Sequence, residues 1–134
     1  MLLETSAIVC AILREPGSER LQELLNLAKI VAVATPCLLE AELVLSGRGV
    51  DARIALPAFL DALHAERIPF RDEHQRVALA AFLRFGRGRH PAQLNFGDCM
   101  SYAVARVSGL PLIYKGDDFG RTDLPLLHRL DRPV

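Results

Sequence analysis

Short hydrophobic runs alternate along the chain with longer segments whose hydrophobic residues recur every three or four positions. The runs at residues 1–3, 30–34 and 110–114 are apolar throughout, as expected of strands buried on both faces of a parallel sheet. The spacing in the longer segments is that of amphipathic helices. Helices are predicted over residues 5–13, 19–28, 37–45 and 51–66, and two further helices are predicted after Asp72 and around Asp98.

Capping and turn residues refine these boundaries. Thr5 or Ser6 is predicted to cap the first helix, and Asp72 the fifth. Two shorter strands are predicted at residues 68–70 and 124–127, and the second contains a proline, which places it at a sheet edge. The alternation of strands and helices over 134 residues predicts a single α/β domain with a parallel central sheet flanked by helices on both faces.

Several acids stand where a strand ends or a buried helix begins. Glu4 follows the first strand, Asp98 lies in the first turn of an apolar helix, and the pair Asp117 and Asp118 follows the third long run. An isolated acid in a first helical turn is explained by the electropositive helix N-terminus. Because parallel α/β sheets bind ligands at the carboxyl ends of their strands, several acids at such positions favour a shared cation.

The helix predicted over residues 37–45 adds two more acids, Glu40 and Glu42. Positions two apart lie about 200° around a helix, so these carboxylates cannot share one face. One of them therefore points inward and the other toward solvent or a partner. The helical geometry alone does not choose between them.

The candidate ligands are all carboxylates, without histidine or cysteine, and this favours Mg²⁺ or Mn²⁺ over zinc. Such an ion orients and deprotonates water and stabilises the charge of a phosphoryl displacement, which is the chemistry of a nuclease. The motifs of competing classes, among them HExxH, Gly-x-Ser-x-Gly, the Walker loop and GxGxxG, are absent from the chain. The acids therefore indicate a metal-dependent nuclease.

A dense basic run covers residues 84–91 and precedes the helix of Asp98. A solvated loop explains such a run by itself. Its position beside the predicted acidic site gives it a second interpretation, because cations there hold phosphates that the acids repel. The candidate RNA-binding residues are Arg87, Arg89 and His90.

The composition narrows the class of protein. Sixteen basic and sixteen acidic residues balance, so the net charge predicts no partner. The hydrophobic content of 51% is high for a small monomer and predicts an apolar surface that binds a second copy and a distinct partner. Three scattered cysteines and the lack of a long apolar run predict a cytoplasmic protein without a membrane segment.

Four motifs resemble those of PIN-domain proteins, and specifically of the VapC-type toxins of bacterial toxin–antitoxin pairs. With the matching length and element order, the resemblance covers nearly the whole chain. The last two motifs are specific, whereas the second is weak alone. The motifs are LETSA at residues 3–7, LLEA at 38–41, GRHPAQLNFGDC at 88–99 and LIYKGDDF at 112–119.

This resemblance implies a PIN-like fold and a Mg²⁺-dependent endoribonuclease that cleaves RNA by metal-activated water. It also implies an inhibitory antitoxin and a homodimer. Glu4 and Asp98 correspond to metal ligands of the family, and the family pattern selects Glu40 over Glu42 as the inward acid.

The last ligand of the family falls within the pair Asp117 and Asp118. Asp118 is favoured because it directly precedes Phe119. Ser6 is a candidate to hydrogen-bond a ligand from the outer shell. The predicted catalytic set is Glu4, Glu40, Asp98 and Asp118, with Asp117 kept as a further candidate ligand.

The sequence departs from the family at Glu4, where the usual residue is aspartate. The extra methylene displaces the carboxylate by about a bond length, and Mg²⁺ demands near-ideal octahedral geometry. Three outcomes are open: Glu4 reaches the ion with a shifted geometry, binds it through water, or leaves the site weakened. The first two keep an enzyme. The third leaves a binding module that acts through an antitoxin or RNA, and a DNA-directed nuclease of the same fold is a further alternative.

Overall fold

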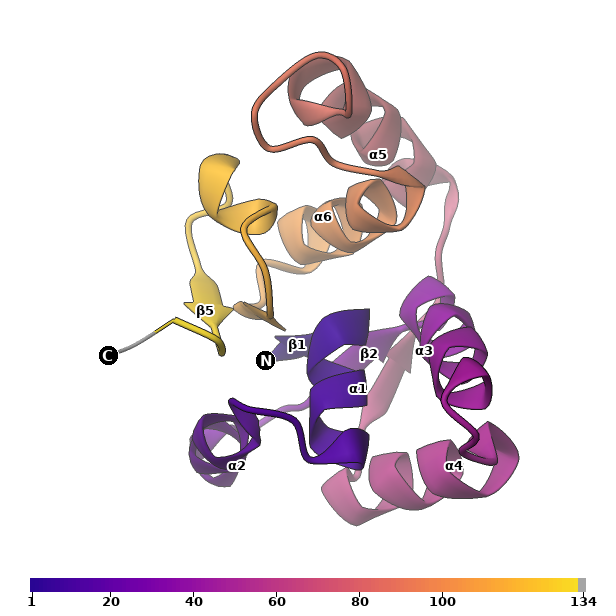
Figure 1. The fold of residues 1–134 in the computed structure, drawn as a ribbon. Coiled ribbons are helices and arrows are strands. Elements are labelled where there is room, and N and C mark those ends of the chain that lie inside the picture. Colours follow the sequence, from indigo (N-terminus) through magenta and orange to yellow (C-terminus); the bar gives the residue numbers. More distant parts are fainter. Residues whose placement is uncertain (133–134) are drawn as a thin grey trace.

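A computed structural model describes residues 1–132, which contain a five-stranded sheet (Figure 1). The strands are β1 (Leu2–Leu3), β2 (Ala32–Ala34), β3 (Glu66–Ile68), β4 (Leu112–Tyr114) and β5 (Leu127–Arg129). All neighbouring strands are parallel, and their order is β3-β2-β1-β4-β5. The predicted α/β class with a parallel central sheet is confirmed.

The helices of the described residues cover both faces of this sheet. They are α1 (Thr5–Leu13), α2 (Ser18–Leu27), α3 (Thr35–Gly47), α4 (Ala52–Leu63), α5 (Asp72–Phe85), α6 (Phe96–Ser108) and the 3₁₀ helix η1 (Phe119–Arg121). Figure 1 shows α5 and α6 on one side and α1, α2 and α4 on the other. The strand order explains this arrangement. From β1 the chain adds β2 and β3 toward one edge of the sheet, and later adds β4 and β5 toward the other edge. Because crossovers between parallel strands are right-handed, the two directions place their helices on opposite faces. None of the helices in residues 1–132 is long and apolar enough to cross a membrane.

Two strand boundaries differ from the prediction. The strand predicted at residues 68–70 is β3, which spans Glu66–Ile68 and ends before Pro69. The strand predicted at residues 124–127 is β5, which begins at Leu127, two residues after Pro125. Both shifts have the same cause, since a proline has no N–H to donate to the strand ladder.

Two predicted helix caps are supplied by the preceding residue instead. Glu4 caps α1, and its carboxylate accepts the backbone N–H of Ser6. Arg71 holds the cap position of α5, its N–H donates to the imidazole of His74, and Asp72 lies in the first turn. Caps are set by which side chain reaches a free N–H, and sequence preference for hydroxyl residues and aspartate does not determine this.

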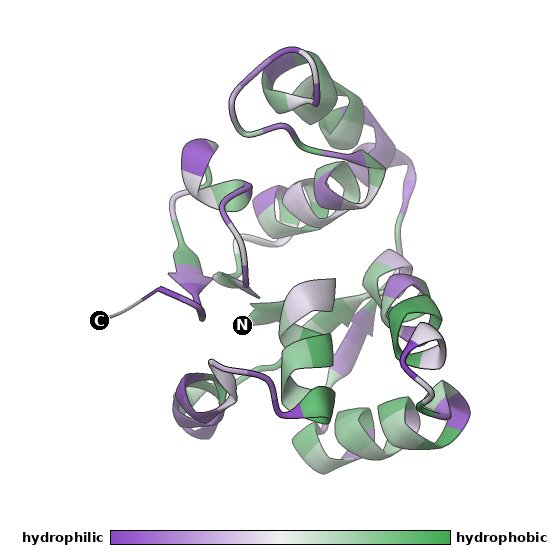
Figure 2. Ribbon diagram, viewed as in Figure 1, coloured by the Kyte–Doolittle hydropathy of each residue, from purple (hydrophilic) through white to green (hydrophobic). Residues whose placement is uncertain are grey.

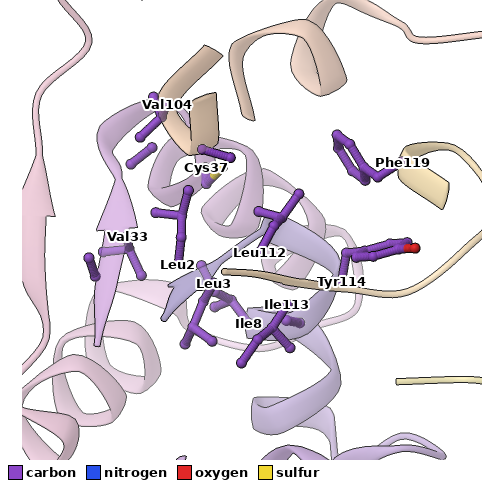
Figure 3. Packing of buried hydrophobic residues seen from close by; sticks show 14 of the residues in the cluster. Leu2, Leu3, Ile8, Val33, Cys37, Val104, Leu112, Ile113, Tyr114 and Phe119 are labelled. Carbon is purple, nitrogen blue, oxygen red and sulfur yellow. The ribbon is translucent and has the colours of Figure 1, made fainter. Parts of the chain in front are cut away.

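The core is built on alternate residues of the central strands. In Figure 3, Leu2 and Leu112 extend to one side of the strands, and Leu3 and Ile113 extend to the other. All four side chains are buried. Leu3 and Ile113 lie with Ile8 of α1, so successive residues of each strand pack against opposite helical layers. This is why the central strands are apolar throughout, and polar side chains are confined to their ends.

Candidate functional site

The predicted acidic residues gather at the carboxyl edge of the sheet, where the strand order reverses between β1 and β4. Glu4 follows β1, Glu40 lies on α3, Asp98 begins α6 and Asp118 follows β4. The negative charges of Glu40 and Asp98 raise the pKa of Glu4, and those of Glu40 and Asp118 raise the pKa of Asp98. These four residues are called the acidic cluster below. Reversal points of this kind are where open α/β sheets bind their ligands.

Glu4 is tied to both central strands through Ser6. Its Oε2 accepts the backbone N–H of Ser6 at 2.8 Å and also the Ser6 hydroxyl. The same hydroxyl accepts the backbone N–H of Lys115 at 2.8 Å. Among residues 1–132 no donor is bonded to Oε1 of Glu4. Ser6 therefore fixes one carboxylate oxygen and leaves the other available.

Burial and like charges keep Glu4 from ionising easily. The side chain is only 5% exposed. Burial is the main cause that raises the pKa of Glu4 to about 7. The hydrogen bonds from Ser6 lower this pKa, and the charges of Asp98 and Glu40 raise it. Near neutral pH the site therefore holds a proton that a cation would displace.

Asp98 combines a helix cap with a place in the acidic cluster. Its N–H donates to Oδ1 of Asn95 at 2.9 Å, and its Oδ2 accepts the N–H of Asn95 at 3.1 Å. Burial raises the pKa of Asp98 to about 6. The Asn95 N–H lowers it, and the charge and hydrogen bond of Asp118 and the charge of Glu40 raise it further. Asp98 therefore takes part in the cap of α6 and also lies among the other acids of the cluster.

The approach of α3 to α6 resolves the choice between the two glutamates of α3. A Cβ on Gly97 would lie 2.5 Å from Oε2 of Glu40, so this glycine lets the carboxylate reach the first turn of α6. Glu42 lies elsewhere, in a small cavity that Arg53 and Arg67 also line. The structure therefore places Glu40 in the acidic cluster and Glu42 outside it. Gly97 was not predicted as a site residue, although its position next to Asp98 was a usable signal.

The two aspartates after β4 point to different neighbours. Asp117 is paired with Arg129 through its Oδ1, and its side chain is 67% exposed. Asp118 interacts with Asp98. The residue after it, Phe119, is buried and packs edge-on against Tyr114 of β4 at 5.3 Å (Figure 3). This packing anchors the backbone that carries Asp118.

The three candidate RNA-binding residues lie in the polar loop between α5 and α6 (Figure 2). The imidazole of His90 accepts the N–H of Ala92 at 3.0 Å and packs edge-on against Phe85 at 5.0 Å. The guanidinium of Arg89 lies over the ring of Phe82. In residues 1–132 no hydrogen bond or ion pair joins the side chains of Arg87, Arg89 or His90 to the acidic cluster. His90 thus has a structural role in the loop.

The acidic cluster offers only oxygen donors, which fits a hard divalent cation. Within residues 1–132, no three histidine, cysteine, aspartate or glutamate side chains already stand in the arrangement of a metal site. Neighbouring carboxylates contribute to the raised pKa of Glu4 and of Asp98. The fit to Mg²⁺ or Mn²⁺ therefore rests on the donor type and on the relief of repulsion that an ion provides.

A model of the PIN domain family matches residues 1–124. The chain belongs to the PIN domain family. Among curated PIN relatives, Ribonuclease VapC30 of Mycobacterium tuberculosis is 36% identical over 92% of this chain and 95% of its own length. Ribonuclease VapC of Mycolicibacterium smegmatis is 35% identical over 96% of this chain and its full length. The predicted resemblance to VapC-type proteins is confirmed.

Solved structures show the same PIN fold at low sequence identity. VapBC2 of Rickettsia felis, bound to a promoter DNA fragment, gives a TM-score of 0.73 at 19% identity and covers 97% of this chain and 98% of that chain. Mycobacterium tuberculosis VapC20, a Sarcin-Ricin loop cleaving toxin, gives a TM-score of 0.74 at 18% identity and covers 92% of this chain and 95% of that chain. At these identities the likeness supports the architecture alone.

The raised pKa of Glu4 predicts a pH-dependent stability. Its pKa is about 7 in the folded chain against an ordinary value of 4.5, so its contribution is fully present below about pH 4.5 and is lost as the pH rises through 7. In a chelator, the free energy of unfolding measured in urea should fall by on the order of 2 kcal/mol from about pH 5 to pH 8. Glu4→Gln should flatten this profile, and the matched change Glu42→Gln should not. Parallel profiles for wild type and Glu4→Gln would contradict the assignment.

Proposed function

We propose that the chain is a Mg²⁺-dependent endoribonuclease and the toxin of a toxin–antitoxin pair. The observation that carries this proposal is the acidic cluster, in which Glu4, Glu40, Asp98 and Asp118 meet from four elements at the carboxyl edge of the sheet. Repulsion among these groups favours uptake of a divalent cation, and oxygen donors suit Mg²⁺ or Mn²⁺. The names of the VapC ribonucleases that align over nearly the whole chain support the same conclusion.

The residues of the chain have separate tasks in this proposal. The ion, when bound by the acidic cluster, supplies a water of lowered pKa and offsets the charge that develops on the phosphodiester. Ser6 holds one oxygen of Glu4 and leaves the other free, which would let Glu4 help to hold the ion. The cap formed with Asn95 fixes the rotamer of Asp98 in the same way. By family resemblance, cleavage leaves a 5′-phosphate and a 3′-hydroxyl.

The RNA backbone is proposed to bind the loop between α5 and α6. Arg87 and Arg89 are exposed there and supply guanidinium donors for phosphates. His90 uses one ring nitrogen within the loop, which leaves Nε2 to face the RNA. These contacts hold the chain of phosphates that the acidic cluster by itself would repel.

An antitoxin and a second copy of the chain are the proposed protein partners. Apolar side chains flank the acidic cluster, with Leu39 and Leu43 exposed around Glu40 on α3 and Phe96 82% exposed beside Asp98. Apolar surface of this kind is usually covered by a partner. The assembly of the Rickettsia felis neighbour, VapBC2, supports an antitoxin as one such partner. We place the protein in the cytoplasm, where its three buried free cysteines stay reduced.

A weakened binding module is the second candidate function, and Glu4 favours it. Its Oε2 is committed to Ser6, and its pKa of about 7 leaves it partly neutral. Glu4→Asp distinguishes the candidates when RNA cleavage is measured with Mn²⁺. An active wild type supports the enzyme, with Glu4→Asp changing the rate by less than about tenfold. An inert wild type whose cleavage returns in Glu4→Asp establishes the binding module instead.

Two adjacent aspartates provide a matched test of the site. Asp118→Asn and Asp98→Asn should each lower the rate of Mg²⁺-dependent cleavage of labelled RNA by more than about 100-fold, because loss of a ligand exceeds the cost of losing an outer-shell partner. Asp117→Asn should keep the rate within about threefold, since Asp117 faces Arg129. Circular dichroism checks that all three variants are folded. Equal loss in Asp117→Asn and Asp118→Asn would overturn the choice between them, and undiminished cleavage by Asp98→Asn would overturn the site.

A further inference from the structure

Charge is segregated along this electrically neutral chain. Between residues 74 and 116 there is one acid, Asp98, against six basic residues. The six are Arg76, Arg84, Arg87, Arg89, Arg106 and Lys115. Over α5, the following loop and α6, residues 72–108, five arginines stand against three acids, Asp72, Glu73 and Asp98. This helical layer, seen in Figure 1, therefore carries a net positive charge.

Three of these arginines line a groove between α5 and α6. Arg76 and Arg84 border it from α5, and Arg106 borders it from α6. The groove has a volume of about 280 Å³, and its floor includes Phe85 and Tyr102. The two rings are buried, and the guanidinium groups of Arg84 and Arg106 lie over them. The guanidinium groups, rather than the rings, are therefore the groups suited to bind phosphates.

Two of the guanidinium groups are held in place by Asp123. Arg84 donates from Nη1 to one oxygen of Asp123 at 3.0 Å, and Nη2 of Arg106 lies 2.8 Å from the other. Tyr102 donates its hydroxyl to the same carboxylate at 2.6 Å. Each arginine uses one terminal nitrogen, so its remaining N–H groups are available to a ligand.

Asp123 offsets only part of the positive charge of the groove. Arg76 forms no ion pair with any residue in 1–132, and its side chain is exposed. The charge of three arginines thus faces a single carboxylate, and the groove keeps a net positive charge that favours an anionic occupant.

The groove and the acidic cluster lie along the same helix. Asp98, Tyr102 and Arg106 are four residues apart on α6 and therefore share a face. Eight residues of helix span about 12 Å, which sets the separation of Arg106 from Asp98 along the axis. The segment from Asp118 to Asp123 follows the same face, because Asp118 interacts with Asp98 and Asp123 binds Tyr102.

We propose that this groove binds the phosphodiester backbone of the RNA at a distance from the cleavage site. The proposal rests on the proposed ribonuclease function and adds a second contact surface to it. The net positive charge and the exposed guanidinium donors fit a polyanion. Alignment with Asp98 along α6 lets one strand of RNA lie in the groove while its scissile phosphate reaches the acidic cluster.

The test measures RNA binding separately from cleavage. In an Asp98→Asn background, the affinity for a fluorescein-labelled single-stranded RNA is measured by anisotropy over a range of KCl concentrations. Arg76→Gln should lower the slope of log affinity against log salt by about 0.7, which is about fivefold weaker binding at 0.1 M salt. Arg76→Lys keeps the charge and should keep the slope. Lys29→Gln removes an exposed cation near the amino ends of the strands and should also keep it.

Several outcomes overturn the proposal. An unchanged slope in folded Arg76→Gln shows that no phosphate binds there. An unchanged slope in Arg76→Gln, together with a sedimentation coefficient that differs from that of the protein with Arg76, shows that the groove is an interface between copies of the chain. An equal fall in Lys29→Gln shows a general charge effect. Cleavage by the wild type is measured in parallel with Mg²⁺, so failure of the ribonuclease proposal is seen independently of the slope.

Discussion

Repulsion between carboxylates at one edge of the sheet is the constraint on which the site depends. Two like charges about 5 Å apart cost roughly 3 kcal/mol at an effective dielectric constant near 20. Burial is the main cause of the raised pKa values of about 7 for Glu4 and about 6 for Asp98, and the neighbouring carboxylate charges raise both values further. A fold that keeps four such groups together stores an unfavourable interaction, and either protons or a cation must relieve it.

The fold holds these groups by tying each one to a different element. Ser6 bonds Glu4 and the backbone after β4, so the two central strands carry their acids at a fixed separation. Gly97 removes the Cβ that would block Glu40, which lets α3 and α6 approach. The parallel sheet makes this possible, because its carboxyl ends all face one edge. The same packing that forms the fold therefore also brings the acids of the site together.

Much of this could be predicted from the sequence, because its signals are local. Continuous apolar runs predicted the parallel strands, and acids at strand ends predicted Glu4 and the pair Asp117 and Asp118, within which the family resemblance favoured Asp118. The inward acid of α3 needed the family pattern, since helical spacing says only that Glu40 and Glu42 diverge. The ion pair of Asp117 with Arg129 joins residues 12 positions apart, and no local sequence pattern predicts it.

The central claim is that the acidic cluster exchanges protons for a divalent cation, and isothermal titration calorimetry tests it most directly. Mg²⁺ or Mn²⁺ is titrated into the wild type at about pH 6.5 in two buffers of different ionisation enthalpy, and again at about pH 8. The account predicts saturable uptake with release of about one proton at the lower pH and less at the higher pH. No uptake, or uptake with the same heat in both buffers at pH 6.5, would contradict it.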